Sequence, residues 1–278
     1  MGEFSWLGDP IDARTAFAPE RQALLTDLRG LAPEQWELPA LPGWTVKDLA
    51  AHLLGDDYGR LGRTRDGYDA GAGPRQDEPF ATFIHRLNQE WVDACVRFSP
   101  RCLLDSLEFT GEQVARLWSV VEPGEYGTPV SWAGADPAPM WLDRARDFTE
   151  YWVHRQQIRE AVGQPVSNEV EALSLVLDTF ARALPFTLRG VSRPEGTRFR
   201  LTIDGAAGST WVVTETGEGW SLDASLPGPV AAEVELAADT AWRLCTRTIE
   251  PSTAISRGRL DGDRELAEAA CEIVSIIR

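Results

Sequence analysis

The hydrophobic pattern of the chain changes its period at Gly163-Gln164-Pro165. Before this point apolar residues recur every three to four positions, which is the period of helices with one buried face. After it, residues 198–203 alternate apolar and polar side chains, as half-buried strands do. The two periods predict two parts, a helical part over residues 1–164 and an α+β part over residues 165–278.

The helical part is expected to contain four helices. The second of them begins after Thr45, which we expect to cap it together with Asp48. The third is expected to kink at Pro100. The loops between them favour a four-helix bundle whose interior can hold a site built from facing helices. The predicted helices span residues 19–31, 46–60, 80–121 and 140–162.

The second part mixes helices and strands. A turn at residues 216–219 predicts a hairpin between two of the strands. A further short strand is expected near residues 254–256. The other predicted strands span residues 198–203, 209–215, 219–223 and 231–236, and the predicted helices span 169–184, 240–248 and 264–277.

The charge of the chain excludes some classes of partner. With 43 acidic residues against 27 lysines and arginines, its formal net charge is −16, so we expect no nucleic-acid partner. No apolar stretch approaches the roughly 20 residues that cross a bilayer, and residues 1–10 lack the pattern of a secretory signal. We therefore expect a cytoplasmic monomer or homodimer with no membrane partner. The four cysteines are scattered and favour reduced thiols.

Histidine chemistry in this chain depends on His52, His85 and His154. Glu150 and His154 are four residues apart, so they share one face of a helix, and His52 lies at the edge of the inward face of another. Two histidines and one carboxylate leave open positions on a metal, the pattern of catalytic zinc and several other divalent-metal sites. The competing interpretation is that the Glu150–His154 pair is solvated or paired within the core.

Other polar residues leave alternatives open. Asp56 or Asp57 could orient the His52 imidazole, or both could be solvated acids. His85, near the start of a predicted helix, is either exposed or a third imidazole ligand. Four arginines of the last third could bind a substrate carboxylate or face water, namely Arg243, Arg247, Arg257 and Arg259.

Residues 41–55, LPGWTVKDLAAHLLG, and residues 150–161, EYWVHRQQIREA, together resemble the metal-binding domain of the mycothiol-dependent maleylpyruvate isomerase family. In that family the domain is a DinB-like four-helix bundle, and a smaller α+β domain like a sterol carrier protein often follows it. The resemblance implies that His52, Glu150 and His154 bind the metal. The family usually has an acidic residue at the position of Gln157.

The resemblance also implies a function. We expect a divalent-metal-dependent isomerase or S-transferase that uses mycothiol or a similar small thiol and acts on a small molecule, with Zn²⁺ as the foremost candidate ion. A C-terminal arginine is important in the founding isomerase, and Arg247 and Arg257 are the candidates here. One alternative is a DinB-like metal hydrolase with His85 as an additional ligand and an activated water. Another is a non-enzymatic protein that binds a metal or a small ligand.

Overall fold

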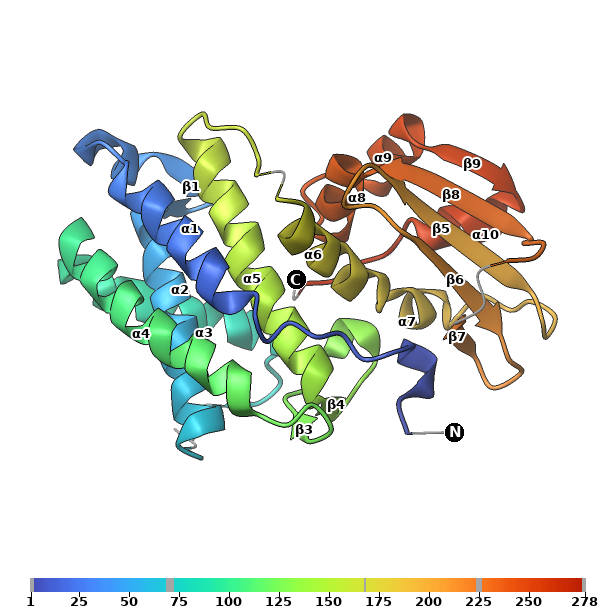
Figure 1. Cartoon of the computed structure of the whole chain (residues 1–278), viewed down its shortest axis with the longest axis horizontal. Coiled ribbons are helices and arrows are strands. Elements are labelled where there is room, and N and C mark those ends of the chain that lie inside the picture. Colours follow the sequence, from blue (N-terminus) through green and yellow to red (C-terminus); the bar gives the residue numbers. More distant parts are fainter. Residues whose placement is uncertain (1–2, 69–72, 168, 224–226, 277–278) are drawn as a thin grey trace. The chain divides into compact units, whose positions relative to one another are not determined.

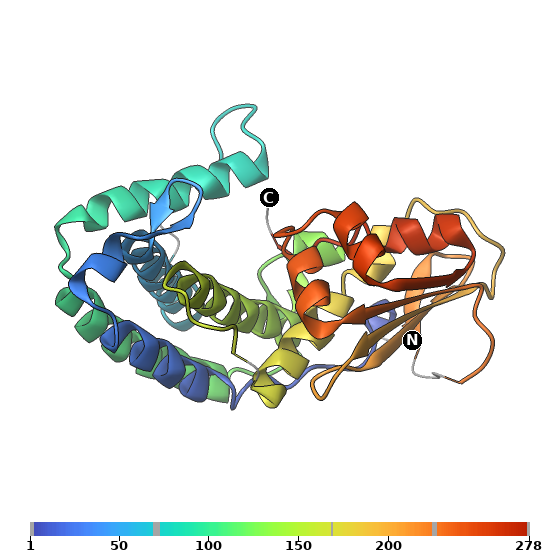
Figure 2. The same cartoon turned by 90° about the horizontal axis from the view of Figure 1, so that it is seen from above.

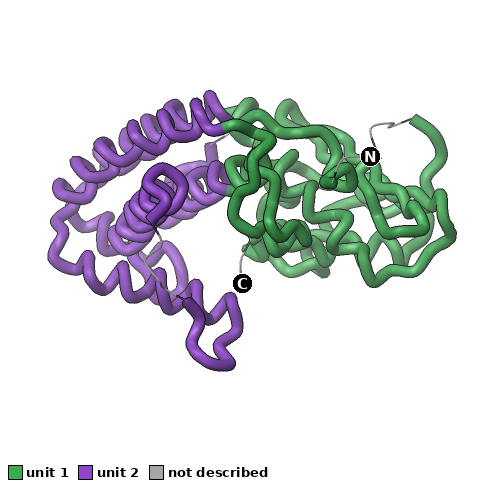
Figure 3. Tube along the Cα trace, turned by 90° about the horizontal axis from the view of Figure 1, so that it is seen from below, with its two compact units in different colours: residues 1–12, 122–146, 168–277 green, residues 13–121, 147–167, 278 purple. Residues whose placement is uncertain are grey.

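The structure of the chain is a computed structural model that describes residues 3–68, 73–167, 169–223 and 227–276. It divides into two compact units, coloured in Figure 3. Unit 1 comprises residues 1–12, 122–146 and 168–277, and unit 2 comprises residues 13–121 and 147–167. Each compact unit combines separate stretches of the chain. The division into domains at residues 1–164 and 165–278 therefore remains a prediction.

Unit 2 is helical. Helix α5 supplies its residues from Asp147 onward to this unit and its first residues to unit 1. Leucine and aromatic side chains, among them Leu24, Leu49, Leu107 and Trp118, are buried between the helices. The helices, labelled in Figure 1, are α1 (Phe17–Arg29), α2 (Val46–Arg60), α3 (Phe80–Ala94), α4 (Pro100–Val120) and α5 (Met140–Ala161).

A tight hairpin leads into α2. Strand β1 (Pro39–Leu41) pairs antiparallel with β2 (Trp44–Thr45), and Gly43 between them has φ of 84°, a conformation that costs glycine little. The expected cap is confirmed: the Asp48 backbone N–H donates to Thr45 Oγ1 at 3.2 Å, and the Thr45 backbone N–H donates to Asp48 Oδ2 at 2.9 Å. These bonds satisfy two amides at the helix start and fix where α2 begins.

The expected single helix over residues 80–121 is wrong, because the chain forms two helices there. Helix α3 ends at Ala94, and a short 3-10 turn follows over Cys95–Arg97. Pro100 is the first residue of α4, where its missing N–H costs nothing, and the Ser99 side chain accepts from the Cys102 backbone N–H at 3.2 Å. The proline therefore starts a helix, with a serine cap, where the sequence predicted a kink.

A buried carboxylate joins four helices of unit 2. Asp57 on α2 is fully buried. It accepts hydrogen bonds from Arg21 of α1, with Nη2 at 2.6 Å and Nη1 at 2.9 Å. It also accepts from the Thr110 hydroxyl of α4 at 2.5 Å and from the Tyr151 hydroxyl of α5 at 2.7 Å. Both oxygens of the Asp57 carboxylate thus accept hydrogen bonds inside the bundle, as a buried ion requires.

The close approach of α1 and α4 depends on Gly111. A Cβ added at this position would lie 2.5 Å from Cγ of Arg21 and 2.7 Å from its Cδ and Nε. Because such contacts are far inside van der Waals distance, the Arg21 side chain reaches Asp57 only over a residue that has no side chain. A second buried carboxylate, Asp147 on α5, accepts from Arg60 Nη2 at 3.0 Å and from Trp118 Nε1 at 2.7 Å.

Unit 1 is built around a five-stranded sheet with the order β7-β6-β5-β8-β9. Strands β5 and β8 are parallel, and the other neighbours are antiparallel. Helices of the C-terminal segment, orange and red in Figure 2, lie together on one face of the sheet. The strands are β5 (Arg198–Asp204), β6 (Thr210–Glu215), β7 (Trp220–Asp223), β8 (Ala232–Ala237) and β9 (Arg259–Gly262). The helices are α6 (Val170–Ala181), α7 (Leu184–Leu188), α8 (Ala238–Cys245), α9 (Pro251–Arg257) and α10 (Arg264–Ala270). A separate two-stranded pairing joins β3 (Tyr126–Gly127) to β4 (Ala138–Pro139).

The expected fold class, a helical bundle followed by an α+β part, is confirmed, and so is the hairpin between β6 and β7. The short strand expected near residues 254–256 is wrong, because this segment lies within α9, which begins at Pro251. The edge strand is β9, a few residues further on.

None of the helices in the described part of the chain is both long and apolar enough to cross a membrane.

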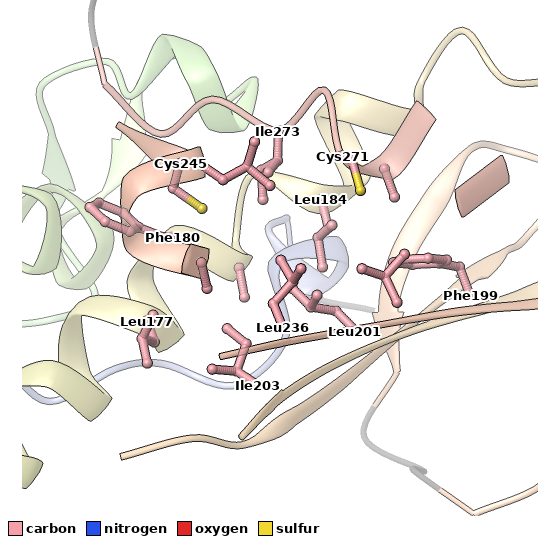
Figure 4. A pocket seen from close by; sticks show the side chains of 15 residues that line it. Leu177, Phe180, Leu184, Phe199, Leu201, Ile203, Leu236, Cys245, Cys271 and Ile273 are labelled. Carbon is pink, nitrogen blue, oxygen red and sulfur yellow. The ribbon is translucent and has the colours of Figure 1, made fainter. Parts of the chain in front are cut away.

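An apolar pocket lies between the sheet of unit 1 and its helices (Figure 4). Phe199, Leu201 and Ile203 line it from β5, and Phe180 and Cys245 line it from helices α6 and α8. The free space at its centre is about 20 Å³, little more than one water molecule needs. The pocket is therefore part of a packed hydrophobic core.

Replacing Asp57 by asparagine keeps the shape of the side chain but removes its charge. Arg21 then loses the carboxylate with which it forms its buried ion pair, so we expect the free energy of unfolding, measured by urea denaturation, to fall by about 3–5 kcal/mol. Asp105→Asn is the matched control, because Asp105 is exposed and lies 3.9 Å from Arg101; it should change the free energy by less than about 0.5 kcal/mol. A loss below about 1 kcal/mol for Asp57→Asn would contradict the role of this charge.

Candidate metal centre

The three residues expected to bind a metal lie together within unit 2. His52 comes from α2, and Glu150 and His154 come from successive turns of α5. One ligand atom from each residue lies within 4.8 Å of the other two. His52 is buried with 6% of its surface exposed, and the other two are half-buried. The structure thus brings the predicted set together, and metal binding by it stays a prediction.

His154 is held from both sides by residues of its own helix. Its Nε2 lies 3.4 Å from Glu150 Oε2, four residues before it. Its Nδ1 lies 2.7 Å from Gln157 Oε1, three residues after it. The neighbours at these spacings are on the same helix face, so the helix itself orients the ring.

His52 has a different environment. Its Nε2 lies 3.3 Å from Asp56 Oδ2, one helix turn further along α2. The ring centroid of Trp44 is 5.1 Å away, and that of His154 is 4.9 Å away in an edge-to-face arrangement. Asp56 is therefore the acid that can orient this imidazole, whereas Asp57 belongs to the buried network that joins the helices.

Trp44 connects the site to α3. Its indole N–H donates to Gln89 Oε1 at 2.8 Å, and the Gln89 amide donates to Asp93 Oδ1 at 2.8 Å. Sequence reasoning did not single out Gln89 or Trp44 as site residues. The available signal for Trp44 was its position next to the cap Thr45, which places it at the start of the helix that carries His52.

The two histidines differ in their affinity for protons. Burial, with the nearby charge of His154, lowers the pKa of His52 to about 3. Burial also lowers the pKa of His154, but the hydrogen bond and charge of Glu150, together with Gln157 and Asp56, outweigh it and raise that pKa above its ordinary value of 6.5. His52 is thus neutral and available as a ligand over the whole physiological range.

The donor set fits a divalent ion. Two imidazole nitrogens and one carboxylate oxygen suit zinc and other first-row divalent metals, whose ligands lie about 2.0–2.2 Å from the ion. Three protein ligands leave at least one position for water or another molecule, as in catalytic sites. The neutral state of buried His52 removes the proton that would compete with the ion.

The other candidate residues are not members of the group of converging ligands found among the described residues. His85 is exposed on α3 and is not in the group of converging ligands found among the described residues. Arg247 and Arg257 belong to unit 1, whereas the three ligands belong to unit 2. Arg247 donates to the Glu272 carboxylate at 2.9 Å and to its backbone carbonyl at 2.8 Å. Arg257 is exposed at the end of α9.

The pKa difference can be measured in the metal-free protein by following the histidine ring resonances against pH by NMR. His52 should show no protonation midpoint above about pH 4, because its buried site disfavours the charged form. His154 should have its midpoint above 6.5, because Glu150 stabilises the charged form. The same midpoint for both rings would contradict the two environments.

Removing one imidazole should empty the site. We expect metal-free protein to take up about one zinc ion per chain and His154→Ala to lose most of it, because two ligands hold zinc poorly. Elemental analysis after gel filtration measures the content. His85→Ala is the control and should retain the metal. Equal loss in both variants would refute the ligand assignment.

Comparison with known proteins places this geometry in a family. The sequence model of the mycothiol maleylpyruvate isomerase N-terminal domain matches residues 17–159. A crystal structure of the mycothiol-dependent maleylpyruvate isomerase matches with a TM-score of 0.50 at 14% sequence identity, covering 86% of this chain and 90% of that chain. A mutant of the mycothiol-dependent maleylpyruvate isomerase matches with a TM-score of 0.49 at 13% identity, with the same coverage. No curated protein matches the chain.

The family model and the solved structure support different statements. The likeness to the crystal structure, at 14% identity, shows the fold. The family match covers half of the chain and includes His52, Glu150 and His154. The chain therefore belongs to the family defined by the mycothiol maleylpyruvate isomerase N-terminal domain.

Proposed function

We propose that the protein is a divalent-metal-dependent enzyme that uses a small thiol, mycothiol or a similar molecule. It either isomerises a small molecule or acts as an S-transferase, in which the thiolate displaces a leaving group from a small molecule. One observation carries the proposal: ligand atoms of His52, Glu150 and His154 converge within 4.8 Å, inside the segment that matches the family. The crystal structure with a TM-score of 0.50 is described as the mycothiol-dependent maleylpyruvate isomerase, which supports the choice of thiol and reaction class.

The three converging residues would hold the ion, and zinc is the foremost candidate among the divalent metals that their nitrogen and oxygen donors suit. A bound divalent ion lowers the pKa of a coordinated thiol, so that thiolate is present at neutral pH. The chain then needs no cysteine of its own as nucleophile. This agrees with Cys245 and Cys271, whose burial raises their pKa to about 12 and keeps both thiols protonated and unreactive.

The surrounding residues prepare the ligands. Trp44 lies against the His52 ring and keeps water from that side of the imidazole. Asp56 Oδ2, 3.3 Å from His52 Nε2, can accept a hydrogen bond from an N–H at that nitrogen and leave the lone pair of the other ring nitrogen for the ion. A carboxylate in this position strengthens a histidine ligand.

Arginine would bind the substrate if the substrate carries a carboxylate. We propose Arg247 and Arg257 for this role. Arg257 is exposed and therefore accessible to a ligand. The Arg247 guanidinium is committed to Glu272, so it would have to exchange that partner for the substrate.

A hydrolase with His85 as a ligand and a carrier of a small apolar ligand each need a feature that the described residues do not show. A hydrolase with His85 as a ligand requires this residue among the converging donors, and it is exposed on α3. A carrier of an apolar molecule requires space for it, and the pocket in unit 1 has about 20 Å³ at its centre.

A thiol titration tests the proposal directly. Mycothiol titrated calorimetrically into zinc-loaded protein should bind at least about tenfold more tightly than into metal-free protein, since the ion is expected to contribute about 1.4 kcal/mol or more through the thiolate. His154→Ala in the presence of zinc should behave like the metal-free protein. Equal affinity of the loaded and metal-free forms, for mycothiol and for other small thiols, would refute the thiol mechanism.

A further inference from the structure

The two ring nitrogens of His154 have different partners. Nδ1 lies 2.7 Å from Gln157 Oε1, and Nε2 lies 3.4 Å from Oε2 of Glu150, which is another of the three converging residues. The His154 side chain is only 12% exposed, so water competes little for the hydrogen bond with Gln157.

The contact with Gln157 is the shorter of the two, and it favours a proton on Nδ1 when the ring is neutral. An amide oxygen only accepts hydrogen bonds, so Gln157 Oε1 pairs with Nδ1 when Nδ1 carries the hydrogen. A neutral imidazole has one N–H, which leaves Nε2 with a free lone pair directed to the side of Glu150. A metal-binding histidine needs this state, with one nitrogen free and the other fixed by an acceptor.

The acceptor on His154 is uncharged, unlike the acid next to His52. Asp56 places a carboxylate 3.3 Å from His52 Nε2, whereas Gln157 is an amide at any pH. The orientation of His154 is thus obtained without a further negative charge beside Glu150.

We propose that Gln157 is a positioning residue that holds His154 in the Nδ1–H tautomer and presents Nε2 to a divalent ion. The statement that Gln157 presents Nε2 to an ion rests on the proposed function. The statement about the tautomer applies to the metal-free protein and rests on the 2.7 Å contact between Nδ1 and Gln157 Oε1.

Zinc affinity, measured by competition with a chromophoric chelator, tests the first part. Gln157→Leu keeps the size of the side chain but removes the acceptor, and it should weaken zinc binding about 10–100-fold. Gln157→Glu retains an acceptor and should bind zinc within about threefold of the wild type or more tightly. Gln22→Leu, at an exposed position of α1, is the matched control and should leave the affinity unchanged.

Two outcomes of this titration would overturn the proposal. One is a zinc affinity of Gln157→Leu within about twofold of the wild type. The other is an equal loss in Gln157→Leu and Gln157→Glu, which would show that any change at this position disturbs the fold of the site and that the acceptor is irrelevant.

The tautomer is measured separately in the metal-free protein by ¹⁵N NMR of the His154 ring at pH 9. The wild type should carry its proton on Nδ1, and Gln157→Leu should shift the proton towards Nε2, where Glu150 can accept it. A wild-type ring protonated on Nε2 would overturn the proposal. If the wild type binds no zinc, the proposed function fails, and the NMR result alone then decides the role of Gln157.

Discussion

The helical unit depends on the carboxylate of Asp57, which is buried without contact to solvent and is paired with groups from three other helices. A charge in the protein interior is tolerated only if every partner is in place, so α1, α2, α4 and α5 are fixed relative to one another by one group. Two of these helices carry the candidate ligands. The interactions of Asp57 therefore both stabilise the bundle and fix the two helices that carry the candidate ligands.

The site combines two histidines of opposite character. Burial keeps His52 neutral, and Glu150 favours the charged form of His154. An ion bound by the proposed ligands would meet a neutral imidazole at His52, whereas His154 would first have to lose a proton, so metal uptake would be coupled to proton release from His154. The family match covers α2 and the part of α5 that carries Glu150 and His154, which agrees with a site that requires both helices.

Features that depend on neighbouring residues could be predicted from the sequence, whereas contacts between residues far apart in the chain could not. The cap at Thr45 and the i,i+4 spacing of Glu150 and His154 are properties of a single helix, so they can be read from neighbouring residues. Pro100 was misjudged because a proline kinks a helix or starts one according to whether the residues before it are helical. The partners of Asp57 are 36, 53 and 94 residues distant, and periodicity says which face is buried but not which polar groups meet there.

The spacing between His52 and Asp57 restricts how this sequence can change in evolution. An insertion of one residue between them would turn the ligand by about 100° around α2 relative to the charge that anchors the helix. Tyr151, which lies between Glu150 and His154, imposes the same restriction on α5. Homologous chains can therefore vary in length in the loop between α2 and α3, whereas insertions and deletions within residues 52–57 and 150–154 should be eliminated by selection.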